Sequence, residues 1–343
     1  MRRSEFSPST AVDMPPCHSS SGYRGVRARP TGSFYTEIRS AGYRLTLGTV
    51  DDDDPVWMDE LYGEKRSETM TLLHDACAQW GFFWVENHGI NDDIMDKFKE
   101  LVNKHYEENM EKNFYSSKIA KTLSPDKVAS NVDWECSFMY HHQPKSNVHD
   151  IPELLRTTVP EYAEEVVKLA EQLAEVMSEN LGLDKDYLKK AFCKPSLGIK
   201  VAKYPRCSHP EVVMGLRGHT DAGGIILLFQ DDLVPGLEFM KDGKRISIPP
   251  TQGNRIFVNL GDQIEVISNG IYKSICHQVL PNQNGSRLSI ATFYNPGADA
   301  IIFPAPKLTY PSQYRFQDYL NFYSTTKFTD KVSRFQNTKM VFK

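Results

Sequence analysis

The sequence predicts an α+β protein: a double-sheet jelly roll, also called a double-stranded β-helix, with a helical N-terminal framework and a C-terminal helix. Two observations support this prediction. Apolar residues recur at helical spacing in three segments before residue 182, and short strand-like runs separated by Gly, Pro, Asn and Asp follow Leu197. No helical pattern separates the later runs, so a parallel sheet is not expected.

The three helical segments each have one apolar face. The first covers 64–80 and ends at Gly81, just before the strand-like run FFWVENHG. The second begins at the cap residue Asn91, and the third covers 160–181 with Gly182 as its C-cap. We therefore expect a helical framework packed on the jelly roll.

Eight runs after Leu197 predict the strands of the jelly roll, because each is short and bounded by turn residues. In this interpretation Asp262 caps the turn before the sixth run, and Glu265 is buried on that strand, so the two carboxylates point to opposite faces. In chain order the runs are GIKVAKYP, GIILLFQ, GLEFM, RISIPP, RIFVNLG, QIEVIS, KSICHQVL and RLSIATFYNP.

The bulk composition is that of a globular protein with a sizeable core. Its 343 residues are 40% apolar and carry a net charge of -4, which indicates neither a nucleic-acid nor an anionic-membrane partner. No apolar run approaches the roughly 20 residues of a membrane helix. Six cysteines without CxxC spacing are typical of reduced thiols, so we expect an intracellular, cytoplasmic protein.

Changes in composition divide the chain into five parts. The first is rich in Ser and Pro and is expected to be disordered, and a run of four aspartates at 51–54 ends the basic N-terminal region. The parts are a disordered 1–22, a β segment at 23–50, the helix-rich part at 55–197, the jelly-roll core at 198–305 and a C-terminal helical tail at 306–343.

The stretch GHTDAGG places His219 and Asp221 one residue apart at the start of an apolar run. On a strand these side chains share a face, so both can contact one ion. His277, in the strand-like run KSICHQVL, is the best third ligand. Two histidines and a carboxylate form the facial triad of non-haem Fe(II) oxygenases, whereas a structural zinc needs four ligands. A surface turn with a capping aspartate is the alternative for an isolated HxD pair.

Arg287 and Ser289 follow His277 and share a face of the last predicted strand. A guanidinium beside a hydroxyl matches the oxygens of a carboxylate or of bicarbonate. A surface ion pair is the alternative for Arg287 taken alone. Next to a candidate triad, an anion site is the better interpretation.

These motifs together resemble the Fe(II)/2-oxoglutarate-dependent dioxygenase superfamily of plants. WGFFWVENHGI at 80–90 and FYNPG at 293–297 are similar to further signatures of that superfamily. Within it, the chain resembles the 1-aminocyclopropane-1-carboxylate oxidases, the ethylene-forming family, from about Pro55 to the C-terminus. The motifs most similar to that family are GLRGHTDAGGIILLFQDD, VNLGDQIEVISNGIYKS and DWECSF.

The resemblance implies roles for polar residues around the metal. Lys200 matches a lysine on a strand that lines the site, and Arg217 and Gln230 match polar positions near the iron, so all three are implied to take part in catalysis. The tail KFTDKVSRF resembles the C-terminal helix of the family, although a basic, solvated helix end is the alternative. The residues implied to bind cosubstrate or activator are Arg287, Ser289, Tyr204, Lys327, Lys331, Arg334 and Phe335.

The same resemblance implies the chemistry. Fe(II) is held by His219, Asp221 and His277, and the substrates are 1-aminocyclopropane-1-carboxylate and dioxygen. Ascorbate supplies electrons, and bicarbonate or carbon dioxide acts as activator near Arg287 and Ser289, with Lys200 or Arg334 as further cations. The products are ethylene, cyanide and carbon dioxide.

The chain departs from the family pattern at a few positions. Ile199 stands where the family has Thr beside the lysine, and we expect this to remove a hydroxyl near the cavity. Gly218 replaces an Ala, and KYPRCSHP is looser than the usual NYPPCP. None of these changes removes a ligand.

Residues 23–49 resemble the three-stranded sheet of the plant ethylene-response-factor type DNA-binding domain, truncated before its helix. Arg24, Arg27, Arg29 and Arg39 match DNA-contacting positions, but Thr31 replaces a contacting Trp. The acidic run that follows repels phosphate, so nucleic acid is not the expected partner. A functional fusion, a folded remnant and a mis-joined reading frame all stay open.

Two other functions stay open. A 2-oxoglutarate-dependent hydroxylase or desaturase of the same fold, acting on a plant hormone or secondary metabolite, would use Arg287 and Ser289 to bind the distal carboxylate of the cosubstrate. A DNA-binding protein with a passive oxygenase scaffold is the third interpretation. His88, between Asn87 and Gly89, is expected to have a structural role in a turn rather than a catalytic one.

Overall fold

The structure is a computed structural model of the chain. It describes residues 23–28, 34–40, 43–47, 56–125, 129–230, 232–305 and 314–325, with the first three ranges, Trp57 and 129–131 described by their backbone alone. The predicted disordered segment 1–22 lies outside the described residues, as does the predicted tail at 306–343 except for 314–325.

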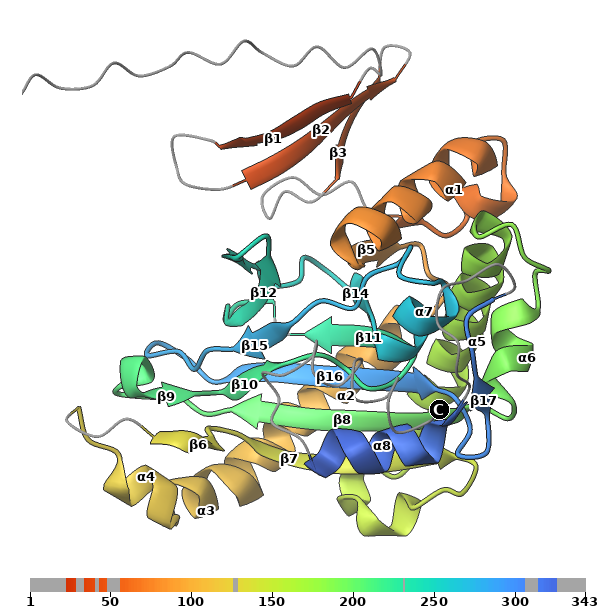
Figure 1. The fold of residues 1–343 in the computed structure, drawn as a ribbon. Helices are drawn as coiled ribbons and strands as arrows, with labels where there is room; N and C mark the ends of the chain where they lie inside the picture. The colour runs from red at the N-terminus through yellow and green to blue at the C-terminus, as the bar shows by residue number, and fades with distance from the viewer. Residues whose placement is uncertain are drawn as a thin grey trace, which may run out of the picture.

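Two β-sheets pack together at the centre of this structure (Figure 1). The larger has the strand order β4-β5-β14-β11-β16-β8-β7 and the smaller the order β10-β15-β12-β13, and all their pairings are antiparallel except that of β4 with β5. This is the predicted jelly roll. The strands are β4 (Val56–Trp57), β5 (Phe82–Glu86), β7 (Cys136–Gln143), β8 (Ser196–Tyr204), β10 (Leu216–His219), β11 (Ile225–Gln230), β12 (Leu237–Lys241), β13 (Lys244–Ser247), β14 (Ile256–Leu260), β15 (His277–Val279) and β16 (Arg287–Asn295).

The long helix α5 packs against β8, β11 and β16 on the outer face of the larger sheet, and α1, α2 and α6 pack against α5 (Figure 1). The apolar face predicted for α5 is buried along its whole length, which confirms the helical framework. The helices are α1 (Arg66–Asp75), α2 (Asp92–His105), α3 (Glu111–Ser116), α4 (Lys118–Thr122), α5 (Thr158–Asn180), α6 (Tyr187–Phe192), α7 (Asp262–Ile267) and α8 (Phe316–Thr325).

The ends of the predicted helices also agree with the structure. The Asn91 side chain accepts a hydrogen bond from the Asp93 N–H and caps α2. The first predicted helix is α1 extended by a π-helical turn at Ala76–Trp80. Gly81 ends it with a φ of 73°, and a Cβ there would lie 2.2 Å from the Lys273 carbonyl oxygen, so only glycine fits.

The larger sheet has a core on each face. Its outer face joins the helices in the main core, which contains Ile199 and Val201. Its inner face joins the smaller sheet in a second core, which contains Ala202 and Phe239. Because neighbouring residues of β8 point to opposite faces, this strand contributes to the main core and to the space between the sheets.

One predicted strand is wrong. QIEVIS forms the helix α7, not a strand, so Asp262 and Glu265 do not lie on opposite strand faces. Both belong to the first turn of this helix, and Asp262 is fully buried. A six-residue helix with alternating polar and apolar residues has the same pattern as a short strand, which explains the error.

Three antiparallel strands expected from the resemblance are described in the N-terminal part, namely β1 (Tyr23–Ala28), β2 (Phe34–Ser40) and β3 (Tyr43–Leu47). The remaining short strands are β6 (Ala129–Asp133), which pairs with β9 (Val213–Met214), and β17 (Ile301–Ile302), which pairs with β18 (Tyr314–Arg315).

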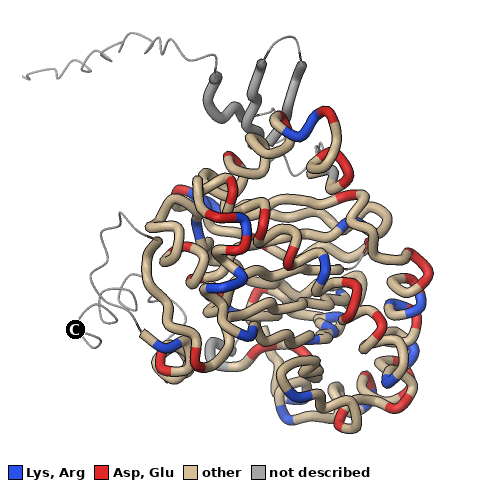
Figure 2. Tube along the Cα trace, turned by 90° about the vertical axis from the view of Figure 1, so that its right-hand side faces the viewer, with Lys and Arg blue, Asp and Glu red and all other residues tan. Residues whose placement is uncertain are grey.

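Charged residues of both signs intermingle over the part of the chain that the structure describes (Figure 2). The five cysteines in that part are free thiols. None of the helices described is long and apolar enough to span a membrane.

Candidate metal centre

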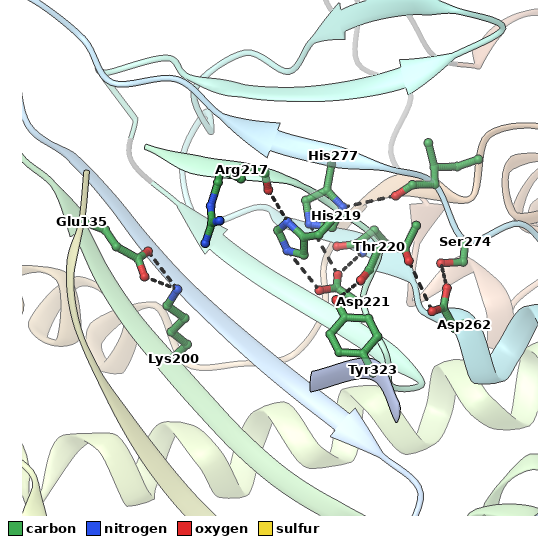
Figure 3. Close-up of polar contacts among 12 residues, drawn as sticks. Glu135, Lys200, Arg217, His219, Thr220, Asp221, Asp262, Ser274, His277 and Tyr323 are labelled. Atoms are coloured by element: carbon green, nitrogen blue, oxygen red, sulfur yellow. Dashed lines mark hydrogen bonds and ion pairs between the residues drawn. The ribbon is translucent and has the colours of Figure 1, made fainter. Parts of the chain in front are cut away.

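Two histidines face each other across a pair of strands in the smaller sheet. His219 is the last residue of β10 and lies opposite His277 on β15 in the register of the antiparallel pair, with ring centroids 4.4 Å apart. Asp221 lies in the turn after β10, so the prediction that it shares a strand face with His219 is wrong. The segment after β10 brings its carboxylate next to the Nε2 atoms of both rings (Figure 3).

Hydrogen bonds orient both rings toward the carboxylate. The Nδ1 of His219 lies 2.8 Å from the Arg217 carbonyl oxygen, and the Nδ1 of His277 lies 3.2 Å from that of Ile275. A carbonyl can only accept, so each Nδ1 carries the proton and each Nε2 keeps a lone pair. These Nε2 atoms lie 3.7 Å and 3.6 Å from the two oxygens of Asp221.

The carboxylate and the rings are held by buried neighbours. The Asn259 side chain donates to the Asp221 Oδ2 at 2.8 Å, and the Phe239 ring stacks on His277 with centroids 4.9 Å apart. Burial lowers the pKa of His219 to about 4, and nearby His277 lowers it in the same direction. His219 is therefore neutral at pH 7, which is the form that binds a metal.

This donor set fits a divalent transition metal. One candidate ligand atom from each of His219, Asp221 and His277 lies within 4.8 Å of the others, and all three residues are buried. Two imidazoles with one carboxylate suit Fe(II) and leave coordination positions for other molecules. A hydrogen bond to a ligand, such as the one that Asn259 donates to Asp221, keeps that ligand in place.

The triad lines a cavity of about 520 Å³, mouth included, between the two sheets. Four other residues predicted for the site also line it, namely Lys200, Tyr204, Arg287 and Ser289. Apolar side chains complete the wall, among them Leu228, Phe239, Val279 and Phe293. Sequence reasoning thus assembled seven of the residues that line one cavity.

Arg287 and Ser289 share the inner face of β16, as predicted. Arg287 is 2% exposed, and its guanidinium lies over the Tyr204 ring, 5.5 Å from the centroid. The Gln230 side chain accepts a hydrogen bond from its Nη2. A buried guanidinium and a hydroxyl on a cavity wall are typical of an anion site.

Lys200 lies on β8, and its ammonium donates to both oxygens of Glu135, at 2.7 Å and 2.8 Å (Figure 3). Two of the predicted catalytic residues do not line the cavity. Arg217 pairs with Asp133, and Gln230 donates to the Pro249 carbonyl behind Arg287. The predicted tail residues lie outside the described residues, namely Lys327, Lys331, Arg334 and Phe335.

Ile199 does not lie near the cavity, contrary to the expectation from the sequence. It is fully buried in the main core, on the face of β8 opposite to Lys200. A hydroxyl at this position would therefore face the helices and not the triad. The departure from the family pattern at Ile199 therefore affects the packing of the main core and not the lining of the cavity.

Sequence reasoning missed a hydrogen-bonded cluster behind the triad. Asp262 accepts from the Ser274 hydroxyl at 2.7 Å and from the Thr220 hydroxyl at 3.3 Å (Figure 3). The Tyr319 hydroxyl also donates to Asp262, at 2.6 Å. Tyr323 donates to the Thr220 carbonyl. The cluster joins α7 and α8 to the turn that carries Asp221. The sequence did contain a signal for this cluster, namely polar residues inside apolar runs, because a buried polar side chain needs a hydrogen-bond partner.

His88 has the structural role predicted for it. Its Nε2 lies 2.7 Å from the Asn254 carbonyl oxygen, and its Nδ1 accepts from the Ile90 N–H at 3.1 Å. We expect His88→Ala to lower the free energy of unfolding by roughly 1–3 kcal/mol, because two partly buried groups lose a partner. Urea unfolding would measure this. Weaker Fe(II) binding by the variant would contradict the structural role.

Known protein families match both halves of the structure. The 2OG-Fe(II) oxygenase superfamily matches residues 195–296, and the family described as non-haem dioxygenase in morphine synthesis N-terminal matches residues 56–161. Among solved structures, JOX2 in complex with 2OG, Fe and JA is 32% identical with a TM-score of 0.66, over 78% of this chain and 83% of that one. The dioxygenase for auxin oxidation in rice has a TM-score of 0.64 and covers 80% of this chain and 95% of its own. Because it is only 22% identical to this chain, the match supports the fold and no more.

Curated relatives are more similar. The chain is 57% identical to 1-aminocyclopropane-1-carboxylate oxidase 1 of Arabidopsis thaliana, over 82% of this chain and 92% of the relative. It is 46% identical to 1-aminocyclopropane-1-carboxylate oxidase of Persea americana, over 82% of this chain and 93% of the relative. These matches confirm the resemblance found in the sequence: the chain belongs to the 1-aminocyclopropane-1-carboxylate oxidase family of the 2OG-Fe(II) oxygenase superfamily, a superfamily that uses Fe(II).

Proposed function

We propose that this protein converts 1-aminocyclopropane-1-carboxylate to ethylene with dioxygen. The observation that supports this most is the buried cluster of His219, Asp221 and His277 in a small cavity, in a chain whose relatives are oxidases of that compound. In this proposal the three residues hold Fe(II). When bound, Fe(II) supplies the one-electron chemistry with dioxygen that side chains cannot perform.

The residues around the triad bind and shield the substrate. Its carboxylate is an anion, and Lys200 and Arg287 bring positive charge to the cavity wall. The apolar residues of the wall, such as Leu228 and Val279, exclude water from the reacting groups. Tyr204 keeps the Arg287 guanidinium in place by stacking under it.

The cosubstrates are also part of the proposal. Ascorbate supplies two electrons, and bicarbonate or carbon dioxide activates the reaction beside Arg287 and Ser289. With dioxygen, two electrons and two protons, 1-aminocyclopropane-1-carboxylate yields ethylene, cyanide, carbon dioxide and two waters. Lys327, Lys331, Arg334 and Phe335 are proposed to bind these small molecules on the strength of the family motif alone.

The boundaries between the parts of the chain and the cellular location of the protein are further proposals. The family matches begin at residue 56, close to the proposed start of the oxygenase at residue 55. Residues 23–50 are proposed to be a separate unit, and a cytoplasmic location is proposed from the pattern of cysteines.

A 2-oxoglutarate-dependent hydroxylase is the second candidate. The buried Arg287 beside Ser289 favours it, since the pair could hold the distal carboxylate of 2-oxoglutarate, and the JOX2 structure contains that molecule.

A cosubstrate comparison tests both functions. Purified protein with Fe(II) is given 1-aminocyclopropane-1-carboxylate with either ascorbate and bicarbonate or 2-oxoglutarate, and headspace ethylene and succinate are measured. We expect ethylene with ascorbate and bicarbonate, and no succinate. Succinate release that depends on 2-oxoglutarate, without ethylene, would establish the second candidate instead.

A further inference from the structure

Two carboxylates on one short segment contact two cations beside the triad. Asp133, the last residue of β6, accepts from the Arg217 guanidinium at 2.9 Å and 3.1 Å. Glu135, just before β7, accepts from the Lys200 ammonium with both oxygens (Figure 3). Lys200 lines the cavity and Arg217 does not, so Glu135 is the acid that acts on the cavity wall.

The residue between them fixes this segment in place. Trp134 is 2% exposed and packs edge-on against the Phe114 ring, with centroids 4.8 Å apart. Its indole N–H donates to the Pro205 carbonyl at 2.8 Å, and its backbone N–H donates to the Met214 carbonyl at 2.7 Å. Glu135 therefore extends from an anchored backbone.

Lys200 needs such a partner for an electrostatic reason. Fe(II) with one carboxylate ligand has a net positive charge, which repels an ammonium group in the same cavity. A carboxylate that contacts the ammonium with both oxygens offsets this repulsion. The side chains of Lys200 and Glu135 are 26% and 17% exposed, so water screens their attraction less than that of a surface pair.

We propose that Glu135 is a positioning residue that holds the Lys200 ammonium at the cavity wall, where it binds a carboxylate-type anion. This inference rests on the proposed function. The anion is either the carboxylate of the substrate or bicarbonate, which share the oxygens that an ammonium recognises. Glu135 acts through Lys200 and does not touch the anion itself.

A double-mutant cycle with Glu135→Gln and Lys200→Gln tests this. We expect Glu135→Gln to raise, about tenfold, either the KM for 1-aminocyclopropane-1-carboxylate or the bicarbonate concentration for half-maximal activation. The constant that changes identifies the anion, and kcat at saturation stays within about twofold. In the Lys200→Gln background, Glu135→Gln should have no further effect. Additive effects, or no change in either constant, would overturn the proposal.

Glu171→Gln is a matched control. Glu171 forms an ion pair with Lys189 between α5 and α6, at 2.9 Å, and neither residue lines the cavity. This variant also loses a carboxylate from an ion pair, and we expect both constants to stay at the wild-type values. If Glu135→Gln does not fold, Glu135→Asp takes its place, since Asp keeps the charge but is one methylene shorter.

A second readout does not depend on ethylene formation. The full chain is treated with acetic anhydride, and mass spectrometry follows the acetylation of Lys200 relative to Lys189. Loss of the Glu135 carboxylate should free the ammonium and raise the relative rate severalfold. An unchanged rate would show that Glu135 does not hold Lys200. Because this measurement needs no turnover, it separates a failure of the inference from a failure of the proposed function.

Discussion

His277→Ala is expected to abolish ethylene formation. The substitution removes one of the three proposed ligands and leaves an imidazole and a carboxylate, which cannot hold Fe(II) in a fixed orientation. Loss of a residue that only hydrogen-bonds to a ligand costs about 10–100-fold in affinity or activity, so loss of a ligand should cost roughly a thousandfold or more. Gas chromatography of the headspace measures ethylene, and anaerobic titration measures Fe(II) binding.

His88→Ala is the control for this experiment, because His88 is a hydrogen-bonded histidine that does not line the cavity. It should keep both ethylene formation and Fe(II) binding. If His277→Ala bound Fe(II) as tightly as the wild type, His277 would not be a ligand. If neither the wild type nor the variant made ethylene although the wild type bound Fe(II), the 2-oxoglutarate alternative would become the leading function.

Asp262→Ala is expected to lower the free energy of unfolding by roughly 3–5 kcal/mol, since a fully buried carboxylate is removed from three hydroxyl donors. The hydroxyls of Ser274, Tyr319 and Thr220 would lose this acceptor. Because Thr220 precedes Asp221, we also expect Fe(II) affinity to fall by about tenfold. Urea unfolding and anaerobic Fe(II) titration measure the two effects.

Asp318→Asn is the matched control on α8. Asp318 pairs with Arg315 at 2.9 Å on the surface, so its loss should change the free energy of unfolding by less than about 1 kcal/mol. A similarly small effect for Asp262→Ala would mean that the buried cluster adds little to stability. Unchanged Fe(II) affinity in that variant would mean that the turn holds Asp221 without it.

The sequence was sufficient to predict the site where the local pattern of residues determines the position of a side chain. Alternation along a strand placed Arg287 and Ser289 on one face, and the HxD spacing together with the strand-like run around His277 identified His219 and His277. The apolar period of α5 predicted its buried face. In each case the neighbours in the chain determine where the side chain points.

The sequence was insufficient where contacts join distant segments. Tyr319 reaches Asp262 across 57 residues, and Lys200 reaches Glu135 across 65. The turn after His219 also differs from a strand, although it still brings Asp221 to the rings. Such contacts depend on how the elements pack, which a pattern of residue types does not specify.

The two-sided strand β8 has a consequence for how this enzyme family can change. Ile199 and Val201 fill the core beneath the helices, while Lys200, Ala202 and Tyr204 face the cavity. Substitutions at the first set are expected to change stability without altering the cavity lining, whereas those at Ala202 and Tyr204 change the cavity lining and the core between the sheets together. Neighbouring codons of one short gene segment therefore differ in kind: one set can adjust stability alone, and the other couples the shape of the cavity to stability.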